Sequence, residues 1–275
     1  MNLCTPRRCL WHRPALAEAG GDELSQLQKK INSIGRREGG VGFGRAIQEK
    51  PRAMLLGAIA ADAGAAKTIL ESGADVVIIT ATDAATGAKA ITAVAAPKAC
   101  IGVRVPALDD AGAEALRKAG CDFVISPLES TSSTAVDSER MGHVVALPEA
   151  IDDTTLRALG PLGLDGLFVE HLDGTLTLAS QLNMVRLASF SSTALLGTVT
   201  VKAPVAELRV LRDSGVAVVV APAGTSAADL ASLAESLKAV PPKKGRREGA
   251  DIALVPAGRA AAEEDDDDDD DDDDE

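Results

Sequence analysis

Short apolar runs alternate with more polar, Ala-rich stretches along most of the chain. Their starts lie 21 to 30 residues apart, which is room for one strand, one helix and two short loops. The runs are rich in Val, Ile and Leu, as is typical of parallel strands that are buried on both faces. The eight runs begin at Ala53, Asp75, Cys100, Cys121, His143, Asp165, Leu195 and Val216.

The stretches between the runs carry helix start and stop signals. "DDAGAEALRKAG" begins with an Asp that can act as N-cap and ends at Gly120, and "TSAADLASLAESLKAV" stops before Pro241. Eight strands alternating with helices predict a (β/α)8 TIM barrel over residues 53–240. The competing fold is a doubly wound open sheet. It would have a Gly-rich first turn, whereas "ADAGAAKT" follows the first run.

The first strand is the least certain element of this pattern, because "AMLLGAIAADAGAAKTILES" could also form one Ala-rich helix. An extra amphipathic helix is predicted before the barrel, with Leu24, Leu27 and Ile31 on one face. The segments expected outside the barrel are a flexible amino terminus (1–21), the helix with a basic Gly-rich segment (22–52), a basic return segment (241–262) and an acidic disordered tail (263–275).

The sequence Gly-Arg-Arg-Glu-Gly occurs twice, once before the first strand and once after the last helix. The first copy continues into "GGVGFG", which looks like a phosphate-binding loop. Such a loop must follow a strand and open a helix, and this segment does neither. We therefore expect Gly35–Ala46 and Gly245–Ala260 to meet at the amino-terminal end of the strands as a basic cap that attracts the acidic tail.

Charge and composition narrow the setting. The net charge of −13 comes from Glu263–Glu275, since without this run 28 acidic residues face 28 Lys and Arg. No stretch is long and apolar enough to span a membrane, and the expectation is a cytoplasmic protein. Cys4, Cys9 and His12 offer only three ligands at loose spacing, so no metal site is predicted.

Candidate chemistry belongs at the carboxyl-terminal end of the strands, here called the mouth, where barrel enzymes place their active sites. Successive side chains of a strand face opposite sides. Alternation therefore turns Arg104, Glu170 and Lys202 toward the barrel interior. Lys202 could form a Schiff base, transfer protons or hold an anion; Glu170 could be an acid/base partner, and Arg104 could hold a carboxylate or phosphate. The alternative is an ion-pair network that only closes the barrel.

The loop after the last strand offers a second candidate. It reads "APAGTSAADL", where Gly224 lets the backbone approach an anion and Thr225 and Ser226 offer hydroxyls at the start of a helix. Ordinary N-capping explains the same two hydroxyl residues, so both interpretations stay open.

"AGCDFVISP", "HVVALPEAIDD" and "LDGLFVEH" follow one another over residues 119–171. This part of the chain resembles the aldolase-type barrels that include the keto-deoxy-phosphogluconate aldolases. The resemblance implies a (β/α)8 barrel and a small acidic or phosphorylated ligand. In that family, a Schiff-base Lys stands on the strand that matches "LDGLFVEH". The matching position here is Gly166, so the aldolase mechanism would need Lys202 in its place.

Two functions follow from these observations. The first is a lyase or isomerase acting on a small anionic metabolite at the mouth. The alternative is a barrel without catalysis, a scaffold or binding protein whose acidic tail engages its own basic cap or a basic partner. No residue indicates a cofactor, although flavin stays open because such barrels often hold it. Self-association into a homo-oligomer also stays open.

Overall fold

Eight parallel strands form a closed barrel in the order β1 to β8, with β8 pairing back onto β1. The computed structural model describes residues 25–35, 52–96, 99–170, 172 and 176–243. The strands are β1 Leu55–Ala60, β2 Val76–Thr80, β3 Ile101–Arg104, β4 Phe123–Pro127, β5 Gly142–Ala146, β6 Gly166–Val169, β7 Leu195–Thr198 and β8 Val216–Ala221. The predicted TIM barrel is confirmed, and the open sheet is excluded.

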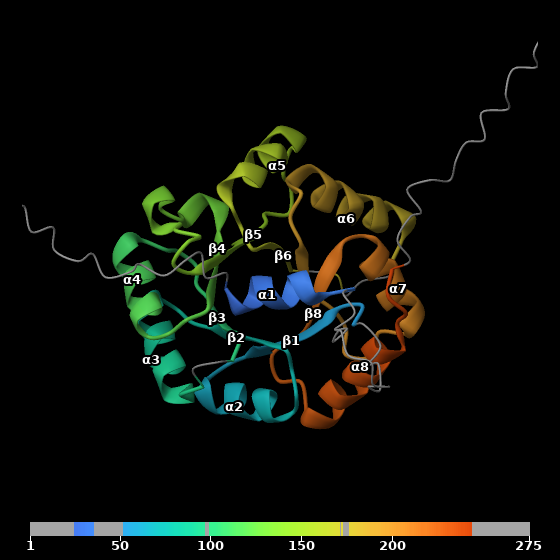
Figure 1. Cartoon of the computed structure of the whole chain (residues 1–275), viewed down its shortest axis with the longest axis horizontal. Helices are drawn as coiled ribbons and strands as arrows, with labels where there is room; N and C mark the ends of the chain where they lie inside the picture. Colours follow the sequence, from blue (N-terminus) through green and yellow to red (C-terminus); the bar gives the residue numbers. More distant parts are fainter. Residues whose placement is uncertain (1–24, 36–51, 97–98, 171, 173–175, 244–275) are drawn as a thin grey trace, which may run out of the picture. The chain divides into compact units, whose positions relative to one another are not determined.

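Helices surround the barrel (Figure 1). They are α2 Ala63–Glu71, α3 Ala84–Val94, α4 Asp110–Lys118, α5 Asp153–Leu159, α6 Leu178–Ser191, α7 Val205–Asp213 and α8 Ala227–Ala239. The first apolar run is a strand and not the start of a long helix, because Asp62 caps α2 by accepting a hydrogen bond from the Ala65 N–H at 2.8 Å.

The connection from β4 to β5 differs from the other connections between successive strands. It contains two 3-10 turns, η1 Leu128–Ser130 and η2 Ser133–Ala135, and no α-helix; a third turn, η3 Gly160–Leu162, follows α5. Without an apolar helix over β4 and β5, polar side chains occupy two positions that face outward from the barrel. Ser126 and His143 are both buried there, with Ser126 Oγ 3.2 Å from His143 Nε2.

Alternate residues of the strands fill the barrel interior, mainly with Val, Ile and Leu. The two large exceptions are Phe123 and Phe168. Glycines on neighbouring strands make room for Phe123 and for Leu196 in the interior. A Cβ on Gly102 would lie 2.3 Å from the Phe123 ring, and one on Gly166 would lie 2.4 Å from Leu196. The opposite strand faces pack against the surrounding helices in a second, larger apolar cluster.

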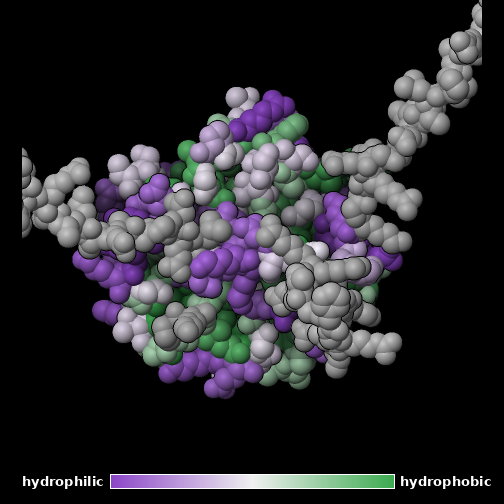
Figure 2. Space-filling model, viewed as in Figure 1, coloured by the Kyte–Doolittle hydropathy of each residue, from purple (hydrophilic) through white to green (hydrophobic). Residues whose placement is uncertain are grey.

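The predicted extra helix is α1, Gln26–Ser33; residues 22–24 of the prediction lie outside the described part of the chain. It lies across the centre of the strand ring in Figure 1, and Figure 2 shows a hydrophilic surface over it. Leu27 is fully buried and packs with the interior residues of the barrel. The helix therefore closes the amino-terminal end of the barrel.

Acidic residues at the strand starts hold α1 in place. The carboxylate of Asp122 accepts hydrogen bonds from the backbone N–H groups of Gln26 at 2.7 Å and Leu27 at 2.9 Å. Ser25 donates to Asp165 at 2.5 Å, and Lys30 Nζ donates to the Asp75 carbonyl at 2.7 Å. The first-turn N–H groups of a helix lack intrahelical partners, so Asp122 satisfies donors that burial would otherwise leave unpaired.

Replacing Leu27 with Ala should lower the free energy of unfolding by about 2–5 kcal/mol, because it leaves a cavity where α1 meets the barrel interior. Asn32 is an exposed residue on the same helix, and Asn32→Ala should change stability by less than about 0.5 kcal/mol. Chemical denaturation measures both. Equal effects of the two substitutions would show that α1 is not part of the folded core.

Candidate functional site at the mouth of the barrel

Arg104 and Glu170 meet at the mouth. Arg104 is the last residue of β3, and Glu170 directly follows β6, so strands from different sides of the barrel bring them together. The guanidinium Nη2 forms an ion pair with the Glu170 carboxylate, and the two side chains are 31% and 38% exposed. Two of the three charged residues that alternation turned toward the interior are thus in direct contact.

The floor beneath this ion pair is apolar. The Arg104 guanidinium carbon lies 5.3 Å from the centroid of the Phe168 ring, a cation–π contact. Phe168 belongs to the buried interior cluster. Partial burial lowers the pKa of Arg104 through desolvation, and the neighbouring Glu170 carboxylate compensates the charge.

Lys202 lies beyond the end of its strand. Strand β7 ends at Thr198, four residues before it, and Lys202 stands in an exposed turn that leads to α7. Within the described part of the chain it forms no ion pair. Its orientation into the interior therefore does not follow from alternation, because a turn has no fixed two-residue period.

The loop after β8 has the geometry of a turn and a helix cap. Gly224 has a φ of +80°, a left-handed conformation that favours glycine. Thr225 Oγ1 donates to the Pro222 carbonyl at 2.7 Å. Ser226 caps α8, accepting from the Asp229 N–H at 3.2 Å, and donates to the Asp229 carboxylate at 2.8 Å. Both hydroxyls have local partners, so the backbone N–H groups of this turn are the better anion donors.

Two threonines complete the inward-facing polar positions near the ion pair. Thr80, at the end of β2, is paired in register with Arg104. Thr198 ends β7 next to β6, where Val169 pairs with Gly197. Alternation predicts that Thr198 faces the barrel interior. The same rule applied to β2 predicts that Thr80 faces the interior, but only the strand register shows that it lies beside Arg104.

Other acidic residues at the mouth act as helix caps. Asp83 accepts hydrogen bonds from the Thr86 N–H at 2.8 Å and from the Thr86 hydroxyl at 2.9 Å, which lower its pKa. Asp152 caps α5 by accepting from the Thr154 and Thr155 N–H groups. The hydrogen bond from the Thr155 hydroxyl, together with these backbone hydrogen bonds, lowers its pKa. These carboxylates are engaged in local structure and offer no obvious catalytic base.

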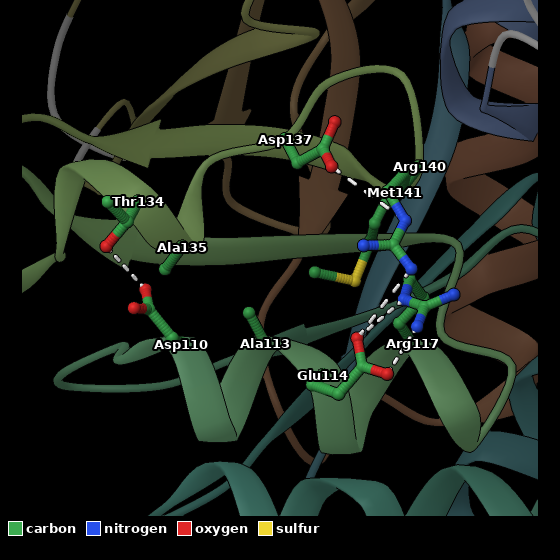
Figure 3. A pocket seen from close by; sticks show the side chains of 9 residues that line it. All are labelled: Asp110, Ala113, Glu114, Arg117, Thr134, Ala135, Asp137, Arg140 and Met141. Carbon is green, nitrogen blue, oxygen red and sulfur yellow. Dashed lines mark hydrogen bonds and ion pairs between the residues drawn. The ribbon is translucent and has the colours of Figure 1, made fainter.

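Two cavities of the described residues lie away from the mouth. One, of about 310 Å³, is lined by α4 and the β4–β5 connection (Figure 3). Its charged side chains have polar partners: Glu114 pairs with Arg117, Arg140 pairs with Asp137, and Asp110 accepts a hydrogen bond from the Thr134 hydroxyl. The other cavity, of about 320 Å³, lies beside the start of α1 and shares Arg140 and Met141 with the first. These contacts between side chains that line the first cavity hold the β4–β5 connection against α4.

Several sequence predictions fall on residues that the structure does not describe. They are the Cys4, Cys9 and His12 group, both basic Gly-rich segments beyond Gly35, and the acidic tail. Among the described residues, no cluster of three or more His, Cys, Asp or Glu side chains could hold a metal ion. No described helix has the length and hydropathy that crossing a bilayer requires.

Comparisons with known proteins agree on the fold. No family model and no curated protein sequence matches this chain. A KGPDC of Streptococcus mutans is 14% identical with a TM-score of 0.54, over 68% of this chain and 98% of that one. The 3-keto-L-gulonate-6-phosphate decarboxylase of Vibrio cholerae is 13% identical with a TM-score of 0.56, over 69% and 99%.

A tryptophan synthase structure of Mycobacterium tuberculosis is 15% identical with a TM-score of 0.57, over 81% of this chain and 100% of that one. Identities this low establish the architecture alone. The comparisons agree with the predicted fold: the chain is a closed (β/α)8 barrel that resembles these structures in architecture.

Two buried groups make stability depend on pH in opposite directions. Burial lowers the pKa of His143 to about 4, so the unfolded chain binds the extra proton and stability rises with pH from about 4 to 6.5. Burial raises the pKa of Asp165 to about 6, against a smaller opposite effect of the Ser25 hydrogen bond. The folded chain then binds the extra proton, and stability falls as pH rises from about 4 to 6.

Asp165→Asn should therefore steepen the pH dependence. Relative to the wild type, the variant should gain about 2–3 kcal/mol of unfolding free energy between pH 4 and 7, because the opposing titration is gone. His143→Gln should change the slope in the other direction. Denaturation at pH 4.5, 5.5 and 7 measures this, and parallel curves for Asp165→Asn and the wild type would refute the assignment.

Proposed function

We propose that the protein is a (β/α)8-barrel enzyme of the lyase or isomerase type that acts on a small anionic metabolite at the mouth. The observation that carries the proposal is the Arg104–Glu170 pair, partly exposed over the Phe168 ring. A fixed cation and a carboxylate at the mouth supply an anion anchor and an acid/base group in the place where barrels perform chemistry.

In this mechanism Arg104 holds the carboxylate or phosphate of the ligand, since its planar guanidinium donates two parallel hydrogen bonds to such groups. When the anion binds, Glu170 is released from Arg104. Its carboxylate then transfers a proton to or from the ligand atom next to the anionic group. The exposed position of Lys202 suits attraction of the anion. A Schiff-base amine is usually desolvated in an apolar pocket, so this role fits Lys202 less well.

The turn of Gly224, Thr225 and Ser226 is the proposed site for a phosphate, if the ligand carries one. Its support is the left-handed Gly224 and the amino terminus of α8, whose first-turn N–H groups attract anions. Asp229 in the first turn of α8 opposes this and favours a singly charged group. The 3-keto-L-gulonate-6-phosphate decarboxylase among the similar structures supports the lyase class through fold alone.

A second candidate is a barrel without catalysis. One observation favours it: Arg104 and Glu170 already satisfy each other across the mouth, as they would in a purely structural closure. In that case the acidic run Glu263–Glu275 would carry the function, by binding the basic cap or a basic partner. Homo-oligomer formation and a cytoplasmic location remain predictions under both candidates.

A thermal-shift screen with small carboxylates and phosphate esters separates the two candidates. Under the proposal, at least one compound raises the melting temperature of the wild type, and Arg104→Gln abolishes the shift. Lys202→Ala should weaken binding about two- to fivefold, the size expected for an exposed charge. Arg209→Gln removes an exposed charge on α7 and serves as the matched control.

An unchanged shift in Lys202→Ala would remove Lys202 from the site. The absence of any stabilising compound would favour the non-catalytic barrel. A shift that Arg104→Gln leaves intact would place the anion elsewhere.

A further inference from the structure

The group that Arg104 already contacts is a carboxylate. Glu170 is paired with the guanidinium, so the mouth already accepts the group that a ligand would bring. A ligand carboxylate can replace Glu170 at Arg104 with little change in the surroundings of the guanidinium. The exchange leaves the Glu170 carboxylate without its cation, while the guanidinium stays over the Phe168 ring.

Glu170 is 38% exposed, so water offsets part of the loss of its cation, and the remaining cost weakens binding of the ligand. A ligand that offers only a carboxylate therefore gains one contact and loses another. A ligand that also carries a hydroxyl or ammonium beside its carboxylate can donate a hydrogen bond to Glu170. Arg104 and Glu170 touch in the closed pair, so the donor must lie within one or two atoms of the ligand carboxylate if the two side chains are to reach both groups.

Thr80 and Thr198 flank the pair from the two sides. Thr80 stands beside Arg104 in the β2–β3 register, and Thr198 ends β7 beside the strand that leads to Glu170. Within the described part of the chain, neither hydroxyl has a hydrogen-bond partner. Thr80 can thus donate to a carboxylate on Arg104, and Thr198 can contact the donor group that faces Glu170.

We infer that the mouth selects small carboxylates that bear a hydroxyl or amino group on the adjacent carbon, which insert between Arg104 and Glu170 and contact Thr80 and Thr198. The inference rests on the proposed function, because it concerns the same site. It goes further by naming the ligand class and two specificity-determining residues.

Three acids with the same three-carbon skeleton test it: propionate carries no donor, lactate carries a hydroxyl and alanine carries an ammonium group. Affinities can be measured by thermal shift and NMR titration at millimolar concentrations. Lactate, alanine or both should bind the wild type at least about tenfold more tightly than propionate, the effect of one hydrogen bond to a charged group. The better of the two identifies the donor that Glu170 prefers.

The variants then locate the recognition. Thr80→Val should weaken all three acids by about three- to tenfold, because it removes a donor to the shared carboxylate. Thr198→Val and Glu170→Gln should weaken lactate or alanine and leave propionate unchanged or tighter. Thr92→Val, which replaces an exposed hydroxyl on α3, is the control and should change no affinity.

The outcomes distinguish this inference from the proposed function. Equal binding of the three acids that Arg104→Gln abolishes would overturn the inference and leave an anion site at the mouth. Binding of lactate or alanine that both threonine substitutions leave unchanged would remove Thr80 and Thr198 from it. If none of the three acids binds while a phosphate ester does so through Arg104, the ligand class is wrong and the proposed function stands. If no anion binds at all, both fail.

Discussion

Closure of eight parallel strands into one barrel is the constraint on which the rest of this structure depends. Closure removes the free edges of the sheet and sends every second side chain of each strand into an interior of limited width. That interior tolerates Phe123 because Gly102 opposes it, and Leu196 fits because Gly166 has no side chain. It also needs a cover at its amino-terminal end, which Leu27 of α1 supplies.

The same constraint made much of the fold predictable. Evenly spaced apolar runs, Asp caps and glycine stops locate the strands and helices, since each element must bury a face and end its own hydrogen bonding. The structure of the β4–β5 connection was harder to predict from sequence, because "LESTSSTAVDSERM" is mostly polar and shows no periodic pattern. Contacts with α4 and with the preceding loop determine its conformation. The hydrogen bonds that Asp122 makes to α1 are likewise long-range, and no local pattern announces them.

Strand alternation predicted the inward orientation of two of the candidate residues. Arg104 is the last residue of β3 and Glu170 directly follows β6, and both point inward as expected. Alternation gives no orientation for Lys202, because β7 ends at Thr198 and a turn has no fixed two-residue period. Thr80 could be found only once the register of β2 against β3 was known. Sequence thus locates side chains on strands, and the structure is needed for neighbours across strands.

We expect the Arg104–Glu170 ion pair to be weak enough for a ligand to displace it, and to contribute little to the stability of the fold. A double-mutant cycle on the free energy of unfolding, with Arg104→Gln, Glu170→Gln and the double variant, tests this most directly. For a pair that is about one-third exposed, the predicted coupling energy is at most about 1 kcal/mol. A coupling of about 3 kcal/mol or more would mark the pair as part of the folded core and contradict the account.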